Sequence, residues 1–474
     1  MVRLALGALI CALAAGCPAP PEIKPPPYGP DSSNPSGPRL FFPTGIAVAP
    51  SGTVLVVNGN FDRAFDFGSI SAISGDFIEG IFASPPADTN DPNQPLPVQI
   101  PASAFTGNAI TGSYGGPLLI DDRQGRGLSG PPIAVFGSRD SSTLNGVQLN
   151  PDGSLTCVGS PTEVDCRNGL IDLTDQQIVA PFGLTAGSAR LPGSSTDVPV
   201  VFVSSLTPWL DLIDNNTVYS RGRVAALRAD DPTQPLFATD TSNYNIANGI
   251  AGGPIVFDDK RRTIIQAGCY QLYPTTTNST PSTGKCGTGN ISNLLRFVGV
   301  DEGNNAEVQL VDISAYVRSN DTSGLALGGF DSNGIARTLY AAVRAPDLIA
   351  EIDLPLNPTE QPTVKRAAPL PVSPSNVLLL QRPATQPGRD LLAITASGSD
   401  SLDIYDTTAS QVVARVEGLG DTPYALAQLP VQPGDTSAKL VVSVFGACRI
   451  ALIDVSYAQP WQSRLRARLG SCPQ

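Results

Sequence analysis

The sequence predicts an all-β fold, a seven-bladed β-propeller, on two observations. Residues 392–406 align without a gap on residues 440–454, and each copy is an apolar strand, a glycine-containing turn and a second strand that ends in aspartate. Self-similarity at a period of about 40–50 residues is typical of a blade array. The chain also carries 46 glycines and 45 prolines, many of which separate short apolar runs, and this composition favours many strands and little helix.

The same outline recurs along most of the chain. Asp353 ends a third copy, 53 residues before Asp406. Further upstream, residues 115–123 (GGPLLIDDR) match residues 252–260 (GGPIVFDDK) almost residue for residue. We therefore predict seven units of four strands, at residues 41–75, 114–150, 179–228, 249–300, 324–355, 373–407 and 421–455. An eight-bladed ring is the alternative, with a degenerate blade hidden in one of the long polar insertions, residues 83–108 or 274–290.

A propeller ring must close between its last blade and its first. Little chain follows Val455, so we expect a strand just before Phe41 to pair with the last blade. The three arginines near the C-terminus, Arg464, Arg466 and Arg468, are interpreted as a solvated chain end.

The N-terminus indicates export and a lipid anchor. Arg3 precedes an apolar run, residues 4–15, which is shorter than the roughly 20 residues that span a bilayer. The following LAAGC segment ends at Cys17 and resembles the cleavage box of bacterial lipoproteins, in which the cysteine becomes the lipidated first residue. An ordinary secreted protein is the alternative. The expected domains are a signal peptide at residues 1–16, a lipidated Cys17 with a proline-rich tether over residues 17–38, and a single propeller at residues 39–474.

The tether and the residue after Cys17 suggest where the protein is held. Pro18 rather than aspartate follows the cysteine, which favours the outer membrane by resemblance to lipoprotein sorting in enteric bacteria. Residues 18–38 contain nine prolines. A polyproline II helix rises by about 3.1 Å per residue, so this tether would reach roughly 60 Å from the membrane. We expect a monomer anchored to the membrane of a bacterial cell envelope by its lipid.

The cysteines predict disulfides. Six remain once Cys11 and Cys17 are set aside, and exported compartments favour disulfide formation. No CxxC spacing occurs, so metal ligation by these thiols is not expected. Pairing of nearest neighbours along the chain is the economical arrangement: Cys157 with Cys166, Cys269 with Cys286, and Cys448 with Cys472.

Charge and composition exclude several classes of function. The formal net charge is −12, and the scattered basic residues do not form the patch that a nucleic acid requires, so no nucleic-acid partner is expected. The chain contains no histidine. This excludes Ser-His-Asp and Cys-His nucleophilic sites, histidine-ligated zinc and an imidazole general base. It also disfavours WD40 blades, which carry a Gly-His signature.

Residues 389–430 resemble the YVTN-type propeller repeat. LLAITASGSDSLDIYD corresponds to that family's strand, loop and Val-x-Val-Ile-Asp strand, and TTASQVVARV to its Thr-x-x-x-Lys-Val-Val-Ala-Thr-Ile segment. Residues 420–423 stand where the family has Gly-x-x-Pro, and residues 41–58 and 421–455 match to a lesser degree. The resemblance implies a propeller and says little about activity, because the motif encodes packing and turns.

Strand direction alternates within a blade, which sorts the loops between two faces. The loop that enters the inner strand and the loop between the second and third strands share one face, usually the one that bears a ligand. Aspartates that recur in these loops most often hold the shape of the loop by hydrogen bonding. The alternative is that carboxylates and amides from several blades converge in a ring around the channel and bind a cation or a sugar-like ligand. The residues expected on this face are Asn58, Asn60, Asp62, Arg63, Ser138, Arg139, Asp140, Arg344, Asp347, Ser399, Asp400 and Arg449.

Several acidic residues are interpreted as turn formers instead. Asp121–Asp122 and Asp258–Asp259 fall between first and second strands, and Asp353, Asp406 and Asp454 end the repeat units. Their oxygen atoms suit Ca²⁺ in principle, but no loop has the spacing of an EF-hand. We therefore expect no cofactor, with Ca²⁺ as the one candidate.

Two functions follow from these features. The first is a non-enzymatic, lipid-anchored propeller that binds a protein or glycan of the envelope, favoured by the anchor, the tether and the lack of a catalytic constellation. The alternative is a metal-dependent hydrolase like the lactonases and gluconolactonases, with a divalent cation held in the central channel by Asp, Glu and Asn. Such a site needs no histidine.

Overall fold

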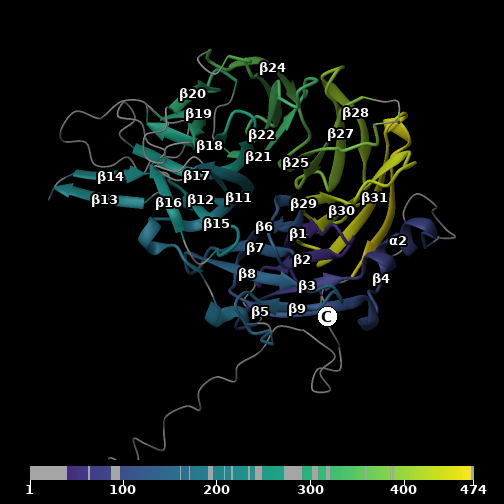
Figure 1. Ribbon diagram of the computed structural model, residues 1–474. Coiled ribbons are helices and arrows are strands. Elements are labelled where there is room, and N and C mark those ends of the chain that lie inside the picture. The colour runs from purple at the N-terminus through teal and green to yellow at the C-terminus, as the bar shows by residue number, and fades with distance from the viewer. Residues whose placement is uncertain are drawn as a thin grey trace, which may run out of the picture.

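The fold was analysed in a computed structural model of the 474-residue chain. Seven antiparallel sheets follow one another along the chain and surround a common centre, so the protein is a seven-bladed β-propeller, as predicted (Figure 1). The structure describes residues 40–61, 65–86, 95, 97–160, 162–169, 171–190, 196–207, 209–214, 217–221, 223–232, 235–240, 248–271, 291–300, 308–316, 321–357, 360–384, 386 and 389–470.

The strands of each blade follow one another in sequence order from the innermost to the outermost, with insertions between some of them. Blade 1 contains β1 (Pro43–Val48), β2 (Val54–Asn58), β3 (Gly68–Ile73) and β5 (Phe105–Thr111). Blade 2 contains β6 (Gly115–Asp121), β7 (Ile133–Ser138) and β8 (Thr143–Leu149), with β9 (Leu155–Cys157) and β10 (Ile171–Asp172) sharing its outer position. Blade 3 contains β11 (Val179–Arg190), β12 (Asp197–Thr207), β15 (Arg223–Arg228) and β16 (Pro235–Asp240).

The remaining four blades repeat this plan. Blade 4 contains β17 (Asn248–Asp258), β18 (Thr263–Gln271), β19 (Ile291–Gly299) and β20 (Val308–Asp312). Blade 5 contains β21 (Asp321–Gly328), β22 (Thr338–Arg344), β23 (Leu348–Asp353) and β24 (Thr363–Pro369). Blade 6 contains β25 (Pro374–Leu379), β26 (Leu391–Ala396), β27 (Ser401–Asp406) and β28 (Gln411–Val416). Blade 7 contains β29 (Pro423–Gln428), β30 (Ser437–Val444), β31 (Arg449–Ser456) and β32 (Arg464–Leu469), with β4 (Pro97–Val98) on its outer edge.

Insertions between strands carry the other elements. A hairpin, β13 (Trp209–Asp214) with β14 (Thr217–Arg221), lies between β12 and β15. Helix α2 (Gly75–Ala83) follows Ser74, whose hydroxyl accepts a hydrogen bond from the Phe77 N–H and caps the helix. No helix within the described residues is long and apolar enough to cross a membrane. The 3₁₀ helices are η1 (Ala102–Ala104), η2 (Gln124–Arg126), η3 (Cys166–Gly169), η4 (Thr174–Gln176) and η6 (Pro460–Gln462).

The predicted units locate the blades and miss their outer strands. Each predicted unit begins within three residues of an inner strand. All seven units, however, stop before the fourth strand. The reason is burial: β26 and β27 are buried at every residue, whereas β24 is exposed at five of its seven. A strand covered on one face only has a weaker apolar pattern, so repeat matching loses it.

Apolar side chains from adjacent sheets form the core between the blades. Tyr340 and Ile349 of blade 5 pack with Leu392 of blade 6, and further on Ile404 of blade 6 packs with Leu440 of blade 7. These contacts bury both faces of the middle strands, which is the sandwich packing expected of stacked sheets. The core is therefore distributed around the ring rather than gathered at one centre.

Glycines let the inner strands approach one another around the axis. A Cβ atom at Gly45 would lie 2.6 Å from the carbonyl oxygen of Gly116 in the next blade, and one at Gly183 would lie 2.7 Å from that of Gly253. At Gly324 the neighbouring atom would be the Val377 backbone nitrogen, at 2.8 Å. Real Cβ atoms do not approach backbone this closely, so glycine at these positions permits the close packing of the ring.

The ring closes differently from the expectation. No strand before Phe41 joins the last blade within the described residues, because blade 7 has four strands of its own. Its fourth strand, β32, is the segment interpreted from the sequence as a solvated end: Leu465, Ala467 and Leu469 are buried, alternating with the arginines. Closure comes from β4, an excursion of blade 1 that pairs parallel with β32, matching Pro97 to Arg468.

Candidate binding face

The inner strands run from one face of the ring to the other. We call the face where they begin the entry face and the face where they end the exit face. The entry face bears the loops between blades and the loops between second and third strands, as the sequence predicted. The entry-face loops of the described chain are residues 40–42, 59–61, 65–67, 112–114, 139–142, 173–178, 313–316, 345–347, 370–373, 397–400, 417–422 and 445–448.

The two asparagines predicted for this face serve blade 1. Asn58 is fully buried; its side-chain oxygen accepts from the Phe41 N–H at 3.1 Å and its amide donates to Ser69 at 3.1 Å. Asn60 has a positive φ of 51°, and its amide donates to the Phe65 carbonyl at 2.6 Å and to the Ser113 hydroxyl at 3.4 Å. Both side chains therefore hold loops in place.

Two predicted aspartates brace the loops between blades in the same way. Asp347 accepts a hydrogen bond from the Ser373 N–H at 2.9 Å. Asp400 accepts one from the Thr422 N–H at 3.2 Å. In each case the second-to-third-strand loop of one blade is tied to the loop that leads into the next blade. Both aspartates thus hold the shape of loops by hydrogen bonding. Because two blades use the same contact, aspartate recurs at the same position of the repeat.

The other predicted polar residues also make local contacts. The Arg344 Nε donates to the Pro374 carbonyl at 2.9 Å, and the Arg449 Nε donates to the Gly470 carbonyl at 3.1 Å. Exposed Asp140 accepts from the Ser141 hydroxyl at 3.2 Å. Ser138 accepts from the Asn145 amide, and the Ser399 hydroxyl donates to the Val372 carbonyl at 3.5 Å. Asp62 and Arg63 lie outside the described residues.

Aromatic side chains, which the sequence did not single out, gather on this face. Phe445 of blade 7 lies 5.2 Å from Phe42 and 5.1 Å from Phe61, measured between ring centroids. Phe61 in turn meets Tyr114 edge-on at 5.1 Å. Phe42 and Tyr114 lie at the entries of blades 1 and 2, whereas Phe61 and Phe445 lie in the second-to-third-strand loops of blades 1 and 7, and all four rings are half-buried. Edge-to-face pairs of this kind are favourable beyond their buried area.

Arg139 extends this group to a third blade. Its guanidinium carbon lies 5.5 Å from the ring centroid of Phe61 and 5.7 Å from that of Phe182 in β11. The half-buried arginine thus bridges two aromatic rings, a geometry that stabilises a cation through the ring quadrupole. We call Phe42, Phe61, Tyr114, Arg139, Phe182 and Phe445 the aromatic arc, because it spans blades 7, 1, 2 and 3 beside the start of the inner strands.

A weak sequence signal for the arc exists. Phe42 immediately precedes β1, Tyr114 immediately precedes β6, and Phe182 lies near the start of β11. Aromatic residues at the entries of three consecutive inner strands form a pattern. It becomes visible only once the strand starts are known to within a residue.

The acidic residues of the exit face form turns, as interpreted from the sequence. The Asp258 carboxylate accepts from the N–H groups of Lys260 and Arg261, each at 3.1 Å, and pairs with the Arg261 guanidinium at 2.6 Å. Asp121 pairs with Arg126. Within the described part of the chain, no three His, Cys, Asp or Glu side chains lie together as a group that could hold a metal ion.

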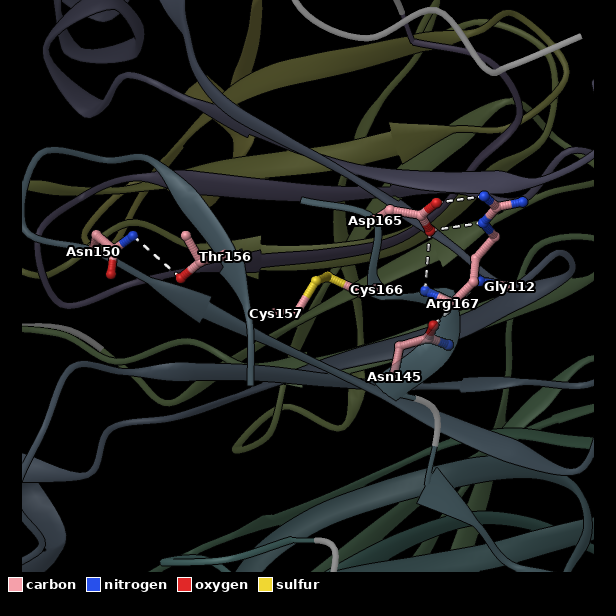
Figure 2. Close-up of a disulfide and its surroundings, with 8 residues drawn as sticks. All are labelled: Gly112, Asn145, Asn150, Thr156, Cys157, Asp165, Cys166 and Arg167. Atoms are coloured by element: carbon pink, nitrogen blue, oxygen red, sulfur yellow. Dashed lines mark hydrogen bonds and ion pairs between the residues drawn. A yellow bond between two sulfur atoms is a disulfide. The ribbon is translucent and has the colours of Figure 1, made fainter. Parts of the chain in front are cut away.

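One predicted disulfide is present. Cys157 and Cys166 are bonded, with Cα atoms 5.1 Å apart, and Figure 2 shows the bond beside the Asp165–Arg167 ion pair. The Arg167 guanidinium holds the pKa of Asp165 below its usual value. The stapled loop contacts blade 1, where the Ile110 N–H donates to the Val164 carbonyl at 2.8 Å. It therefore links blades 1 and 2 at the rim.

Among the other cysteines predicted to form disulfides, the structure describes the side chain of Cys448. Cys448 is disulfide-bonded, in agreement with the prediction that it pairs. Its predicted partner Cys472 and the predicted lipidation site Cys17 lie outside the described residues. The same holds for Cys286 and for the side chain of Cys269, so their pairing stays a prediction.

Comparison with known proteins yields similarity of structure alone. No family model and no curated protein matches the sequence, so the YVTN-type resemblance stays a prediction. A functionally unknown protein from Desulfotomaculum acetoxidans aligns over 84% of this chain and 96% of its own, with 10% identity and a TM-score of 0.44. Hydrazine synthase from Kuenenia stuttgartiensis aligns over 80% and 99%, with 10% identity and a TM-score of 0.42. Virginiamycin B lyase from Staphylococcus aureus aligns over 86% and 94%, with 10% identity and a TM-score of 0.43. Similarities at this level carry no conclusion about what the chain binds.

Proposed function

We propose that the protein is a lipid-anchored, non-enzymatic binding module of a bacterial cell envelope, and that the aromatic arc is where a protein or glycan partner docks. The arc carries the proposal. Aromatic residues and arginine are the residue types that dominate binding energy at protein interfaces, and aromatic rings also stack on sugars. Here five rings and one guanidinium lie together on the entry face.

The entry face is prepared for binding by its internal hydrogen bonds. Asn60, Asp347 and Asp400 each fasten an entry-face loop to a neighbouring one. A surface that is already ordered loses little conformational entropy when a partner docks, so more of the contact energy appears as affinity.

The anchor is proposed from the sequence. Leu40 and Phe41 begin two residues after the end of the predicted tether and lead into β1 at the entry face. A tether attached there would reach the domain beside the aromatic arc. Conversion of Cys17 to alanine should move the protein out of the membrane fraction of fractionated cells; a Cys17→Ala protein that stays equally membrane-bound contradicts the anchor.

A crosslinking experiment tests the docking face. Full-length protein on intact cells would be crosslinked to its neighbours and compared with Arg139→Gln and Phe61→Leu variants, alongside binding to arrayed envelope glycans. Loss of a hot-spot contact costs about 2 kcal/mol or more, so adduct or glycan binding should fall by roughly thirtyfold. The matched control is Trp461→Leu, which removes an aromatic side chain that is 67% exposed in the loop between β31 and β32 on the exit face. Equal binding by all variants contradicts the assignment of the arc.

The hydrolase alternative lacks a supporting observation. It requires several oxygen ligands around one cation, and Asn58 and Asn60, which carry suitable amides, are hydrogen bonded within blade 1. Metal analysis of purified protein decides: a stoichiometric divalent cation together with lactone hydrolysis would replace the binding proposal.

A further inference from the structure

The central channel opens on the exit face through a pocket of about 430 Å³, which we call the channel pocket. It forms where four inner strands end, those of blades 1, 2, 6 and 7. Its wall is aliphatic and includes Ala47, Val48, Ile120, Leu379 and Ala427. None of the described residues that line it is aromatic. The volume falls within the range of about 300–1,000 Å³ that is typical of small-molecule sites.

Three of the described residues that line the pocket are polar, and the side chain of one, Gln428, is hydrogen bonded to the backbone of another, Gln381. The Gln428 amide donates to the Gln381 carbonyl at 2.7 Å, and the Gln381 N–H donates to the Gln428 side-chain oxygen at 2.8 Å. The Tyr457 hydroxyl donates to the same Gln381 carbonyl at 2.5 Å. These bonds fasten the rim between blades 6 and 7. The third residue is Asp122, which makes no ion pair with any other residue that the structure describes.

We propose that the channel pocket binds a linear aliphatic chain that ends in a cation, as in a primary alkylamine. The alkyl chain would lie along the aliphatic side chains of the wall, where each methylene that leaves water contributes to binding. A sugar would find no ring to stack on. The ammonium group would lie against Asp122.

Charge supports the choice of a cation. Among the described residues that line the pocket, Asp122 alone carries a charge, and the whole chain has a formal net charge of −12. A negative field of this kind attracts cations and repels carboxylates. The inference does not rest on the proposed function, since the channel pocket lies on the exit face and the aromatic arc on the entry face.

A chain-length series tests the aliphatic part. Calorimetric titration with n-butylamine through n-decylamine would use the full chain carrying Cys17→Ala, so that no lipid or detergent competes. Each added methylene should strengthen binding by about fourfold until the pocket is full, after which the affinity should level off. Affinity that does not change with chain length overturns the proposal.

Filling the pocket locates the binding. Ala47→Phe places a ring in the wall at the end of β1, and Ala427→Phe does so from β29. Either variant, once circular dichroism shows that it is folded, should weaken decylamine binding by tenfold or more. Val372→Phe is the matched control, because Val372 is 59% exposed in the loop between β24 and β25 on the entry face. A folded filling variant that binds as tightly as this control overturns the proposal.

Head groups of matched length test the cation. Decylamine should bind at least about threefold more tightly than decanol, and decanoate should bind more weakly than both. The substitution Asp122→Asn replaces one carboxylate oxygen by an amide nitrogen and removes the negative charge. It should therefore abolish the preference for the amine over the alcohol. This result remains available even if both filling variants fail to fold. Equal binding of decanoate and decylamine to the unmodified protein overturns the assignment of the cation.

Discussion

The hydroxyl of Tyr405 donates a hydrogen bond of 2.6 Å to the carboxylate of Glu351, across the interface between blades 6 and 5. Both side chains are buried. Arg366 lies 3.4 Å from the other oxygen of Glu351. Burial raises the pKa of Tyr405, and the contact with Glu351 raises it further, so the hydroxyl keeps its proton and remains a donor at physiological pH. A buried carboxylate between two apolar sheets is thus satisfied by a neighbouring blade.

Removal of this donor should destabilise the ring. In Tyr405→Phe the Glu351 carboxylate stays buried with one partner fewer, and we expect the free energy of unfolding in urea to fall by about 1–3 kcal/mol. Tyr424→Phe, at a half-buried tyrosine in β29, is the matched control and should change it by less than about 0.5 kcal/mol. Equal effects of the two substitutions would show that the bond between the blades contributes nothing specific.

Acid should weaken the fold through Asp406. Burial alone would raise the pKa of Asp406, but hydrogen bonds from Arg389 and from the N–H groups of Ala409 and Thr408 outweigh it and hold the pKa below 3.8. A pKa that is lower in the folded state stabilises the protein above the unfolded value, and this stability is lost as pH falls through the folded value. We therefore expect unfolding free energy to decline below about pH 4.

The variant Asp406→Asn isolates this contribution. It should make the decline of unfolding free energy below about pH 4 shallower than in the unmodified protein, because one titrating carboxylate is gone. Asp353→Asn alters an exposed aspartate at the equivalent position of blade 5 and serves as the control. An acid decline identical in all three proteins would rule out Asp406 as its source.

The Cys157–Cys166 disulfide should stabilise the rim of blades 1 and 2. It closes a loop of sequence separation 9. Chain-entropy arguments for so short a loop predict that the double variant Cys157→Ser/Cys166→Ser loses about 2–3 kcal/mol of unfolding free energy. Urea unfolding under oxidising conditions measures this loss. A double variant as stable as the parent would mean that the loop holds its place by the Ile110 hydrogen bond and packing alone.

Peptide mapping under non-reducing conditions should identify the partner of Cys448. The cysteine is disulfide-bonded, and nearest-neighbour pairing assigns it to Cys472. A linked peptide containing residues 448 and 472 is the expected product. A link from Cys448 to residue 269 or 286, or a free thiol at Cys472, would contradict the pairing.

The C-terminal segment shows how a pattern present in the sequence can be misjudged. Residues 464–469 alternate arginine with leucine or alanine, which is the signature of a half-buried strand. Three arginines are too few to indicate a binding patch, and their charge favours a solvated chain end. The structure places this segment as β32, with Arg466 paired to Asp454 on the neighbouring strand. The alternation of residue types therefore indicates the strand correctly, and the charge of the arginines is misleading.

The candidate sites, in contrast, depend on contacts between residues that are far apart in the sequence. Phe61 and Phe445 are 384 residues apart in the chain and 5.1 Å apart between ring centroids. The channel pocket likewise joins strand ends from Ile46 to Pro430. No local pattern reports such contacts, because they depend on the order of the blades, on how the ring closes and on how side chains are directed at each strand end.

The sequence by itself determined the all-β class, the seven inner strands, the turn role of the aspartates and the pairing of Cys157 with Cys166, since each follows from local periodicity, turn chemistry or short spacing. Tertiary structure decided the closure of the ring through β4 and β32, the aromatic arc and the aliphatic channel pocket. These features exist only where distant blades meet, and packing between blades is set by the whole ring rather than by any one repeat.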